Sequence, residues 1–454
     1  MMMSLIAICL VAVMVLLWLL RRNRISLGLP IAYLYSLLLI HLPGAVAHIF
    51  GREFLLHSDL VEMAMRFTAV ASVCFVTGVW LARSTVGEVL GGRYIDRSSF
   101  NWFCLIGGWI FIYGLTPLYD IPSVAAALDK GSAIWTLGVT LGLRSAFQAG
   151  DRKRVVIWTL AMMAFPIFIL LLGGFLSYGS AAIILVCSAL TISTPDFRRV
   201  AVGMTLFTFV SLSIFVTYFH HRNDIRKQVW GGAPLDARID SVLNTGKDFE
   251  WLDLTNPDHL NALDERLNQN YFVGLAARRI AQGQANYLKG ESLWEGLISL
   301  VPRLIWPDKP VYGGSPQIVS KMTGLRFNAH TSIGVGNVME LQVNFGMPGV
   351  AVGFLILGWL IGRLDYRAAA AEARGDLVKL ILYYLPCVAL IQPNGSIVEL
   401  TGGAAAALVG AYIWKWIWTS WSRRRTVRMR NLLMGSPTLL INPTLSKTNT
   451  FKSS

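Results

Sequence analysis

The sequence contains eleven apolar runs of about 17–25 residues, the length that an α-helix needs to cross a lipid bilayer. Hydrophobic residues make up 54% of the 454 residues and charged residues only 15%, against roughly 25% in soluble domains. These proportions exclude a soluble globular protein, a disordered chain and a coiled coil. We therefore predict an all-α polytopic membrane protein with spans at residues 3–20, 28–50, 61–82, 101–119, 132–148, 155–174, 177–194, 200–219, 346–364, 377–393 and 397–419.

Basic residues gather in every second loop between these runs. The first group is Arg21, Arg22 and Arg24, and the last begins at Lys415. Because cytoplasmic loops carry the excess of Lys and Arg, the N-terminus is predicted outside and the C-terminus inside. The first run lacks a preceding basic region, so it is predicted to be a span and not a signal peptide. The net charge of +14 then belongs to short cytoplasmic loops, and no nucleic-acid partner is expected.

The topology divides the chain into four parts. Residues 1–219 hold spans one to eight, 220–345 form an outer loop, 346–419 hold the last three spans, and 420–454 form a basic cytoplasmic tail that we predict to be disordered. The outer loop is too long to lack its own structure, and it carries 13 basic and 13 acidic residues. Its apolar spacing predicts a small helical cap, with one helix from Pro257 through Leu275 and a short one between Ser315 and Gly324.

Two features of the outer loop can carry chemistry. The proline-rich stretch 301–312 is predicted to be a stiff, non-helical rod, in which Arg303 and Lys309 can hold a phosphate or diphosphate. Trp306 can pack on a sugar ring, but the same three residues also suit an anchor at the lipid headgroups. Further along, Glu340 is the one acidic residue between residues 328 and 362. A partly desolvated carboxylate there can act as a general base, and a hydrogen-bonded structural anchor is an equal alternative.

Three further arginines are candidates for binding an anion. Arg278 and Arg279 lie on the expected outer helix, where they form either a solvated face or a diphosphate-binding pair. Arg66 stands four residues after Glu62 near the outer end of the third span. Such a pair often neutralises itself, although charges within a membrane span are functional candidates by default.

Several common sites are absent from the sequence. It contains neither a nucleotide-binding glycine motif nor a zinc-protease motif, and the cytoplasmic loops are too short for a fused ATPase domain. The five cysteines all lie in apolar runs, which gives no disulfide framework and no metal-ligand spacing. We therefore expect no metal and no cofactor.

One stretch resembles a known family. Pro302-Arg303, Trp306-Pro307 and Lys309-Pro310, followed by Gly334, Gly336, Glu340, Asn344-Phe345-Gly346 and Gly349, are similar to the signature of Wzy-type polysaccharide polymerases, also called oligosaccharide repeat unit polymerases. The resemblance is clearest over residues 296–365. The rest of the chain matches only in layout, with many spans and one large outer loop near the C-terminal third.

The resemblance implies a metal-independent glycosyltransferase on the periplasmic face of the bacterial inner membrane. Its substrates would be two undecaprenyl-diphosphate-linked oligosaccharides, and its protein partners a chain-length regulator and a flippase. In such an enzyme Arg303, Lys309, Arg278 and Arg279 would stabilise the leaving diphosphate. Glu340 or His330 would accept the proton of the attacking hydroxyl, and Trp306 and Tyr312 would line the glycan path. The resemblance assigns no role to Arg66.

Two alternatives stay open. The related O-antigen ligases share the general layout and differ in using the lipid A core as acceptor, a choice that depends on pocket shape. A transporter or flippase for lipid-linked oligosaccharide is the alternative from another class. Transporters often contain inverted repeats and polar residues at the bilayer midplane. This sequence shows no such repeat, and its charges gather at the outer ends of the spans.

Overall fold

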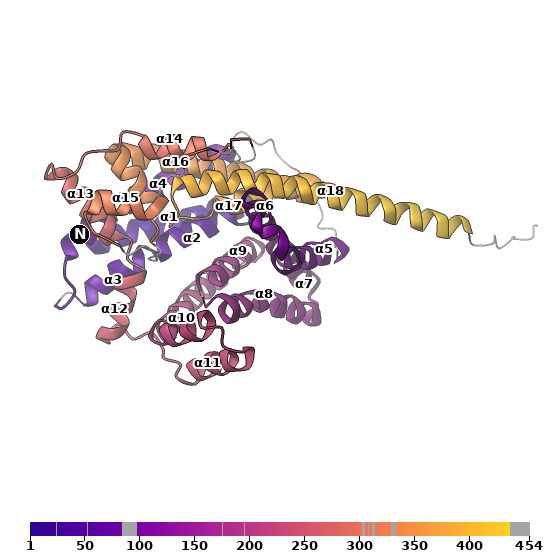
Figure 1. Ribbon diagram of the computed structural model, residues 1–454, viewed down its shortest axis with the longest axis horizontal. Coiled ribbons are helices and arrows are strands. Elements are labelled where there is room, and N and C mark those ends of the chain that lie inside the picture. The colour runs from indigo at the N-terminus through magenta and orange to yellow at the C-terminus, as the bar shows by residue number, and fades with distance from the viewer. Residues whose placement is uncertain are drawn as a thin grey trace, which may run out of the picture.

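The computed structural model describes residues 1–23, 25–51, 53–83, 98–174, 176–194, 196–301, 305–306, 308–310, 314–327 and 333–435. Within these ranges the chain is helical and contains no strand (Figure 1). Its α-helices are α1 (Met2–Asn23), α2 (Leu29–Leu39), α3 (Leu42–Phe50), α4 (Ser58–Arg83), α5 (Ser98–Trp109), α6 (Pro122–Ser132), α7 (Ile134–Ala149), α8 (Arg152–Gly173), α9 (Ser177–Ser193), α10 (Phe197–Trp230), α11 (Leu235–Lys247), α12 (Pro257–Arg266), α13 (Asn270–Ala281), α14 (Glu291–Ser299), α15 (Gly314–Thr323), α16 (Asn337–Arg374), α17 (Leu377–Ala389) and α18 (Ile397–Gly435). A π-helical turn, η1 (Ile110–Gly114), and a 3-10 turn, η2 (Thr116–Asp120), follow α5.

In the described part of the chain, seven helical segments are long and apolar enough to cross a membrane. They are Met2–Arg22, Leu29–Phe50, Ser58–Arg83, Arg152–Gly173, Phe197–Trp230, Asn337–Arg374 and Ile397–Arg424. Two shorter apolar helices cover Gly179–Ser193 and Leu377–Ala389. The predicted all-helical membrane architecture is thus confirmed, whereas the count of eleven spans and their orientation stay predictions.

The helices of the outer loop do not all lie together. Figure 1 shows α12, α13 and α15 at the end of the molecule that holds the N-terminus, while the C-terminal part of α18 projects from the opposite end. α11 instead packs on α8 and α10, at the edge of the molecule away from α14 (Figure 1). Segment 220–345 therefore has two parts, of which only the later one packs on α16 and α18.

The helical path of the chain breaks between α2 and α3 at residues 40–41. This break also interrupts the single helix that is predicted for the outer loop. The helix expected over residues 257–275 is two helices, α12 and α13, because backbone groups at their junction bond to the α2–α3 break. Leu267 accepts a hydrogen bond from the Gly44 N–H at 3.1 Å, and the Gln269 N–H donates to Ile40 at 2.9 Å. Buried polar backbone groups at one interruption are satisfied by those at the other. The start of α12 is as predicted, with the Asn256 side chain accepting the Asp258 N–H.

Helices α4 and α16 cross at unusually close range because glycines face each other. A Cβ on Gly358 would lie 2.1 Å from the Phe75 carbonyl oxygen, and a Cβ on Gly78 would lie 2.1 Å from the Leu355 carbonyl oxygen. Gly362, one turn further along α16, sits against Val79 and Ala82. Small residues at such spacing let two helix backbones approach in a membrane, where apolar side chains gain little by leaving lipid.

We expect Gly358→Val to separate α4 from α16. The added side chain has no free space, so the helices must move apart, at a cost of about 1–3 kcal/mol or more. The melting temperature of the detergent-solubilised protein should fall clearly. Gly203→Val on α10 is the matched control, since a Cβ at Gly203 meets no atom within 4 Å. Equal melting temperatures for the two variants would show that the glycine crossing does not set the packing.

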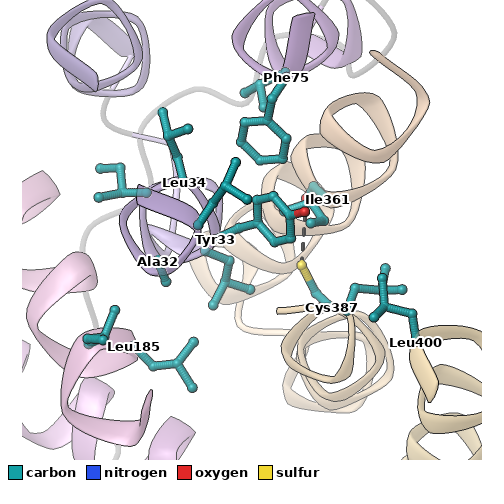
Figure 2. Close-up of a cluster of buried hydrophobic side chains, with 14 of the residues drawn as sticks. Ala32, Tyr33, Leu34, Phe75, Leu185, Ile361, Cys387 and Leu400 are labelled. Carbon is teal, nitrogen blue, oxygen red and sulfur yellow. Dashed lines mark hydrogen bonds between the residues drawn. The ribbon is translucent and has the colours of Figure 1, made fainter. Parts of the chain in front are cut away.

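Buried side chains of α2, α4, α16 and α17 pack together in the core (Figure 2). Tyr33 of α2 stacks on Phe75 of α4 with ring centroids 4.7 Å apart, and its hydroxyl donates to Asn337 Oδ1 at 2.7 Å. On the other side of α16, the Cys387 thiol donates to the Ile361 carbonyl at 3.6 Å. All five cysteines are free, as predicted. Asn337 is the first residue of the helix that bears Glu340.

Candidate functional site

The glycines before α16 bring its first turn against the loop that precedes α18. The Gly336 and Asn337 N–H groups donate to the carbonyls of Asn394 and Pro393, at 3.1 and 2.9 Å. A Cβ on Gly334 would lie 2.1 Å from the Asn394 oxygen, so the backbones could not meet with any larger residue there. The absence of a side chain at these glycines is what permits the close approach of the two backbones.

Glu340 lies on the first turn of α16 and is fully buried. Its Oε2 accepts the Ile397 N–H, the first of α18, at 2.7 Å. The positive end of a helix favours a carboxylate in this position. Within the described residues, Oε1 is buried and lies beyond hydrogen-bond distance of any partner, although Ser292 is close enough to act on the carboxylate. Glu340 is therefore an anchor through Oε2, and in the described part of the chain its Oε1 has no hydrogen-bond partner within 3.5 Å.

A second carboxylate, Glu399, lies at the same helix start but has both oxygens occupied. Its Oε2 accepts the Ser396 N–H at 3.0 Å, and the Ser396 hydroxyl in turn accepts the Glu399 N–H at 3.2 Å. This reciprocal pair is a capping box. The Ser315 hydroxyl donates to Glu399 Oε1 at 3.3 Å. Glu399 thus holds α15 and the first turn of α18 together.

Helix α14 packs beside Glu340. Its inward face packs on the start of α18, where Thr401 Oγ1 donates to the Gly296 carbonyl at 2.8 Å and also meets the Ser299 hydroxyl at 2.7 Å. Asn344 Nδ2 donates to the Ser292 hydroxyl at 2.8 Å, which fixes that side chain beside Glu340. Burial raises the pKa of the neighbouring Glu295, and the nearby Glu291 adds to the effect. The site therefore gathers carboxylates and hydroxyl groups under one short helix.

The outward face of α14 is apolar. Trp294 is 64% exposed, and Leu297 and Leu300 follow it at intervals of three residues. Ile305 and Trp306, just beyond the helix, are also exposed. A soluble surface rarely carries such a stripe, whereas a helix in the lipid headgroup region does.

Among the predicted cations, Lys309 is the one that contacts the C-terminal end of α14. Its Nζ donates to the carbonyls of Ser299 and Val301, at 3.2 and 2.9 Å. A cation is stabilising at the C-terminal end of a helix, where carbonyls are unpaired. Ser299 in turn donates to the Val398 carbonyl, next to the residue that binds Glu340. Lys309 is therefore linked through Ser299 to the start of α18, the same helix end that binds Glu340.

The structure describes three more of the candidate arginines, and each of them contacts a different part of the chain. Arg278 forms an ion pair with Asp59 of α4, and Arg279 donates to the Met322 carbonyl at 3.4 Å and packs against Gly324. Arg66 is exposed on α4, and its guanidinium meets the sulfur of Met1 at 3.6 Å. The three arginines contact other parts of the chain, and among the described residues none of them forms a hydrogen bond or an ion pair with Glu340. Arg303, Tyr312 and His330 lie outside the described residues.

A cavity of about 390 Å³ lies between α10 and α11, away from α14. Its lining residues are His221, Asp224, Gln228, Ala237, Asp240, Ser241, Asn244, Thr245 and Asp248. No residue among the predicted candidates lines it. The sequence indicated Ser315 as a helix start and Asn344 as part of the motif, but it gave no sign of Ser292, which Asn344 holds beside Glu340. The capping box that holds the nearby Glu399 does have a local signature, the Ser-x-x-Glu pattern at residues 396–399.

Comparison with curated proteins and with solved structures found no match. A family model described as a domain of unknown function, DUF8712, matches residues 50–372. The matched segment covers more than half of the chain and includes α4, the outer-loop helices and Glu340. The chain therefore belongs to the family described as DUF8712.

Proposed function

We propose that the protein polymerises undecaprenyl-diphosphate-linked oligosaccharide repeat units into a long polysaccharide on the periplasmic face of the bacterial inner membrane. The product would be an O-antigen, a capsule or a secreted polysaccharide. The proposal starts from the similarity of residues 296–365 to Wzy-type polymerases. The observation that carries it is Glu340, a buried carboxylate with one oxygen fixed and the other free.

In the proposed reaction, the free Oε1 of Glu340 takes the proton from a sugar hydroxyl of the incoming repeat unit. The hydroxyl oxygen attacks the anomeric carbon of the growing chain and forms the new glycosidic bond. The bond between that carbon and the diphosphate oxygen breaks, and undecaprenyl diphosphate leaves with the electron pair. The fixed Oε2 keeps the carboxylate oriented, because its hydrogen bond to the Ile397 N–H permits little rotation.

The surroundings of Glu340 suit a lipid-linked substrate. The exposed apolar stripe on α14, with Trp294, Leu297 and Leu300, is the kind of surface that lies among lipid headgroups. A polyprenyl chain in the bilayer would then have its diphosphate at the level of this helix. Lys309 stands at the end of α14 and supplies a positive charge there. We expect Arg303 to supply a second one, by the resemblance of its motif.

The arginines of α13 have a weaker claim to the diphosphate. Arg278 is already neutralised by Asp59, and Arg279 is held against α15. We therefore assign these two residues to the packing of α13 on α4 and α15. Arg66, exposed on α4, has no part in the proposed site.

Deletion of the gene, followed by sizing of the surface polysaccharide, tests the function and separates it from its main alternative. Loss of long chains, with single repeat units still transferred to the lipid A core, is the expected result. Loss of all attachment, with long lipid-linked chains still made, would mean that the protein is a ligase. Restoration of long chains by a plasmid copy of the wild-type gene is the control for effects on neighbouring genes.

A further inference from the structure

Three side chains from separate helices form a continuous chain of hydrogen bonds at the end of the molecule that holds the N-terminus. Ser58, the first residue of α4, meets His48 of α3, with 2.9 Å between Oγ and Nδ1. His48 then meets Asp264 of α12, with 2.7 Å between Nε2 and Oδ1. The His48 side chain is 2% exposed, so its ring is held between its two partners. The arrangement is a serine, a histidine and an aspartate in line.

The partners of His48 determine which ring nitrogen carries the proton. An ionised aspartate accepts hydrogen bonds only, so Nε2 must donate to Asp264. In the neutral ring Nδ1 is then the acceptor, and the Ser58 hydroxyl must donate to it. A serine whose proton points at a histidine base, itself oriented by a carboxylate, has the arrangement of an activated nucleophile. Here the two ring nitrogens have exchanged the roles that they take in the serine proteases.

The backbone around Ser58 adds two independent features. His57 has a φ of 68°, and in the described residues only Lys289 shares a positive φ among residues other than glycine. Strained residues of this kind cluster at active sites. The His57 carbonyl accepts the Leu60 N–H at 2.9 Å, so α4 starts directly after it and Ser58 lies at the positive end of a 26-residue helix. That end stabilises negative charge that develops on a nearby oxygen.

Ser58 lies partly at the surface of the molecule. Ser58 is only partly buried, whereas the histidine behind it is closed off. The chain before it exposes Phe54 and Leu56, which are 43% and 75% exposed. Asp264 is further fixed by the Asn268 amide, which donates to its Oδ1. Ser58 is therefore partly exposed, its base is buried between two hydrogen-bond partners, and two exposed apolar side chains lie just before it in the chain.

We propose that Ser58, His48 and Asp264 form a second site that transfers acyl groups from carboxylic esters to water. The Ser58 oxygen attacks the ester carbonyl while His48 Nδ1 takes the hydroxyl proton. The carbon–oxygen bond to the alcohol breaks, and His48 returns the proton to the leaving alcohol. Water then attacks the acyl-serine, His48 accepts a proton from it, and a carboxylic acid is released as Ser58 regains its proton. Phe54 and Leu56 favour an acyl chain that is apolar.

A fluorophosphonate probe tests the site on the full-length protein in detergent, with the labelled residue identified by peptide mass spectrometry. We expect covalent labelling of Ser58 and hydrolysis of p-nitrophenyl butyrate. Ser58→Ala and His48→Gln should lose both. Asp264→Asn should slow labelling by on the order of 10²–10⁴-fold, because an amide that donates to His48 selects the wrong tautomer. The pH profile of the residual rate should also change, which loss of packing alone would not cause.

The controls separate this site from packing and from the proposed polymerase. A wild-type protein that is not labelled at Ser58, or labelling that His48→Gln leaves unchanged, would overturn the proposal whatever the stability of the variants. Glu340→Gln should be labelled at the wild-type rate, because the proposed ester site does not depend on the proposed polymerase site. Loss of labelling in a folded Glu340→Gln protein would contradict that independence.

Discussion

Glu340→Gln should lower polysaccharide chain growth by on the order of 10²–10⁴-fold, the usual contribution of a general base. The amide keeps an oxygen that can accept the Ile397 N–H, so the hydrogen bond at 2.7 Å and the fold should survive. What it removes is the free carboxylate oxygen. Chain length, measured by gel electrophoresis of surface polysaccharide at equal membrane levels of the two proteins, is the readout.

Glu399→Gln is the matched control for this experiment. Both glutamates accept a backbone N–H at the start of α18, but Glu399 has both oxygens engaged. A glutamine satisfies a capping box as well as a glutamate does, so this variant should make chains of normal length. If Glu340→Gln also made normal chains, Glu340 would be an anchor only, and the base would have to be another group.

Asp365→Ala should destabilise the protein severely. Asp365 of α16 is fully buried, and it accepts the Ser26 hydroxyl at 2.6 Å and the N–H groups of Leu27 and Leu29 at 3.0 and 3.3 Å. Each buried donor that loses its partner costs about 1–3 kcal/mol. Three such losses are comparable with a large part of the roughly 5–15 kcal/mol that stabilises a folded domain. Fluorescence-detected size exclusion should show little monodisperse protein.

Asp365→Asn is the conservative companion. Its amide oxygen can still accept both N–H groups, and the Ser26 hydroxyl can rotate to accept from the amide nitrogen. We expect this variant to retain most of the wild-type melting temperature. A normal melting temperature for Asp365→Ala would show that water replaces the carboxylate, and that the start of α2 does not depend on it.

Most of the helices could be predicted because their signals are local. Apolar runs of membrane-spanning length, and caps such as Asn256, are each contained within one segment of sequence. Asp365 shows where this reasoning ends. Its position after a span suggests a solvated cytoplasmic charge, but the structure uses it to bind the start of α2, more than 330 residues earlier. No sequence pattern near Asp365 indicates that its hydrogen-bond partners lie at the start of α2.

The same distinction between local sequence signals and tertiary contacts applies to the candidate site. Glu340 was found from sequence because it is a single carboxylate in an otherwise uncharged stretch, beside glycines that permit close packing. The partners of Arg278 could not be found in this way. Its ion pair with Asp59 joins α13 to α4 through the tertiary fold, and the same spacing of residues suits a solvated or an anion-binding face equally well. The sequence shows which residues are charged, but tertiary packing determines which of them form ion pairs within the protein.

Chain growth in a purified system tests the proposed function most directly. The full-length protein in liposomes would be supplied with undecaprenyl-diphosphate-linked repeat units on the side that corresponds to the periplasm. We predict polymers of many repeat units and release of undecaprenyl diphosphate, both lost in Glu340→Gln. Movement of the lipid-linked units across the bilayer, with no bond formed between them, would contradict the polymerase and support a transporter.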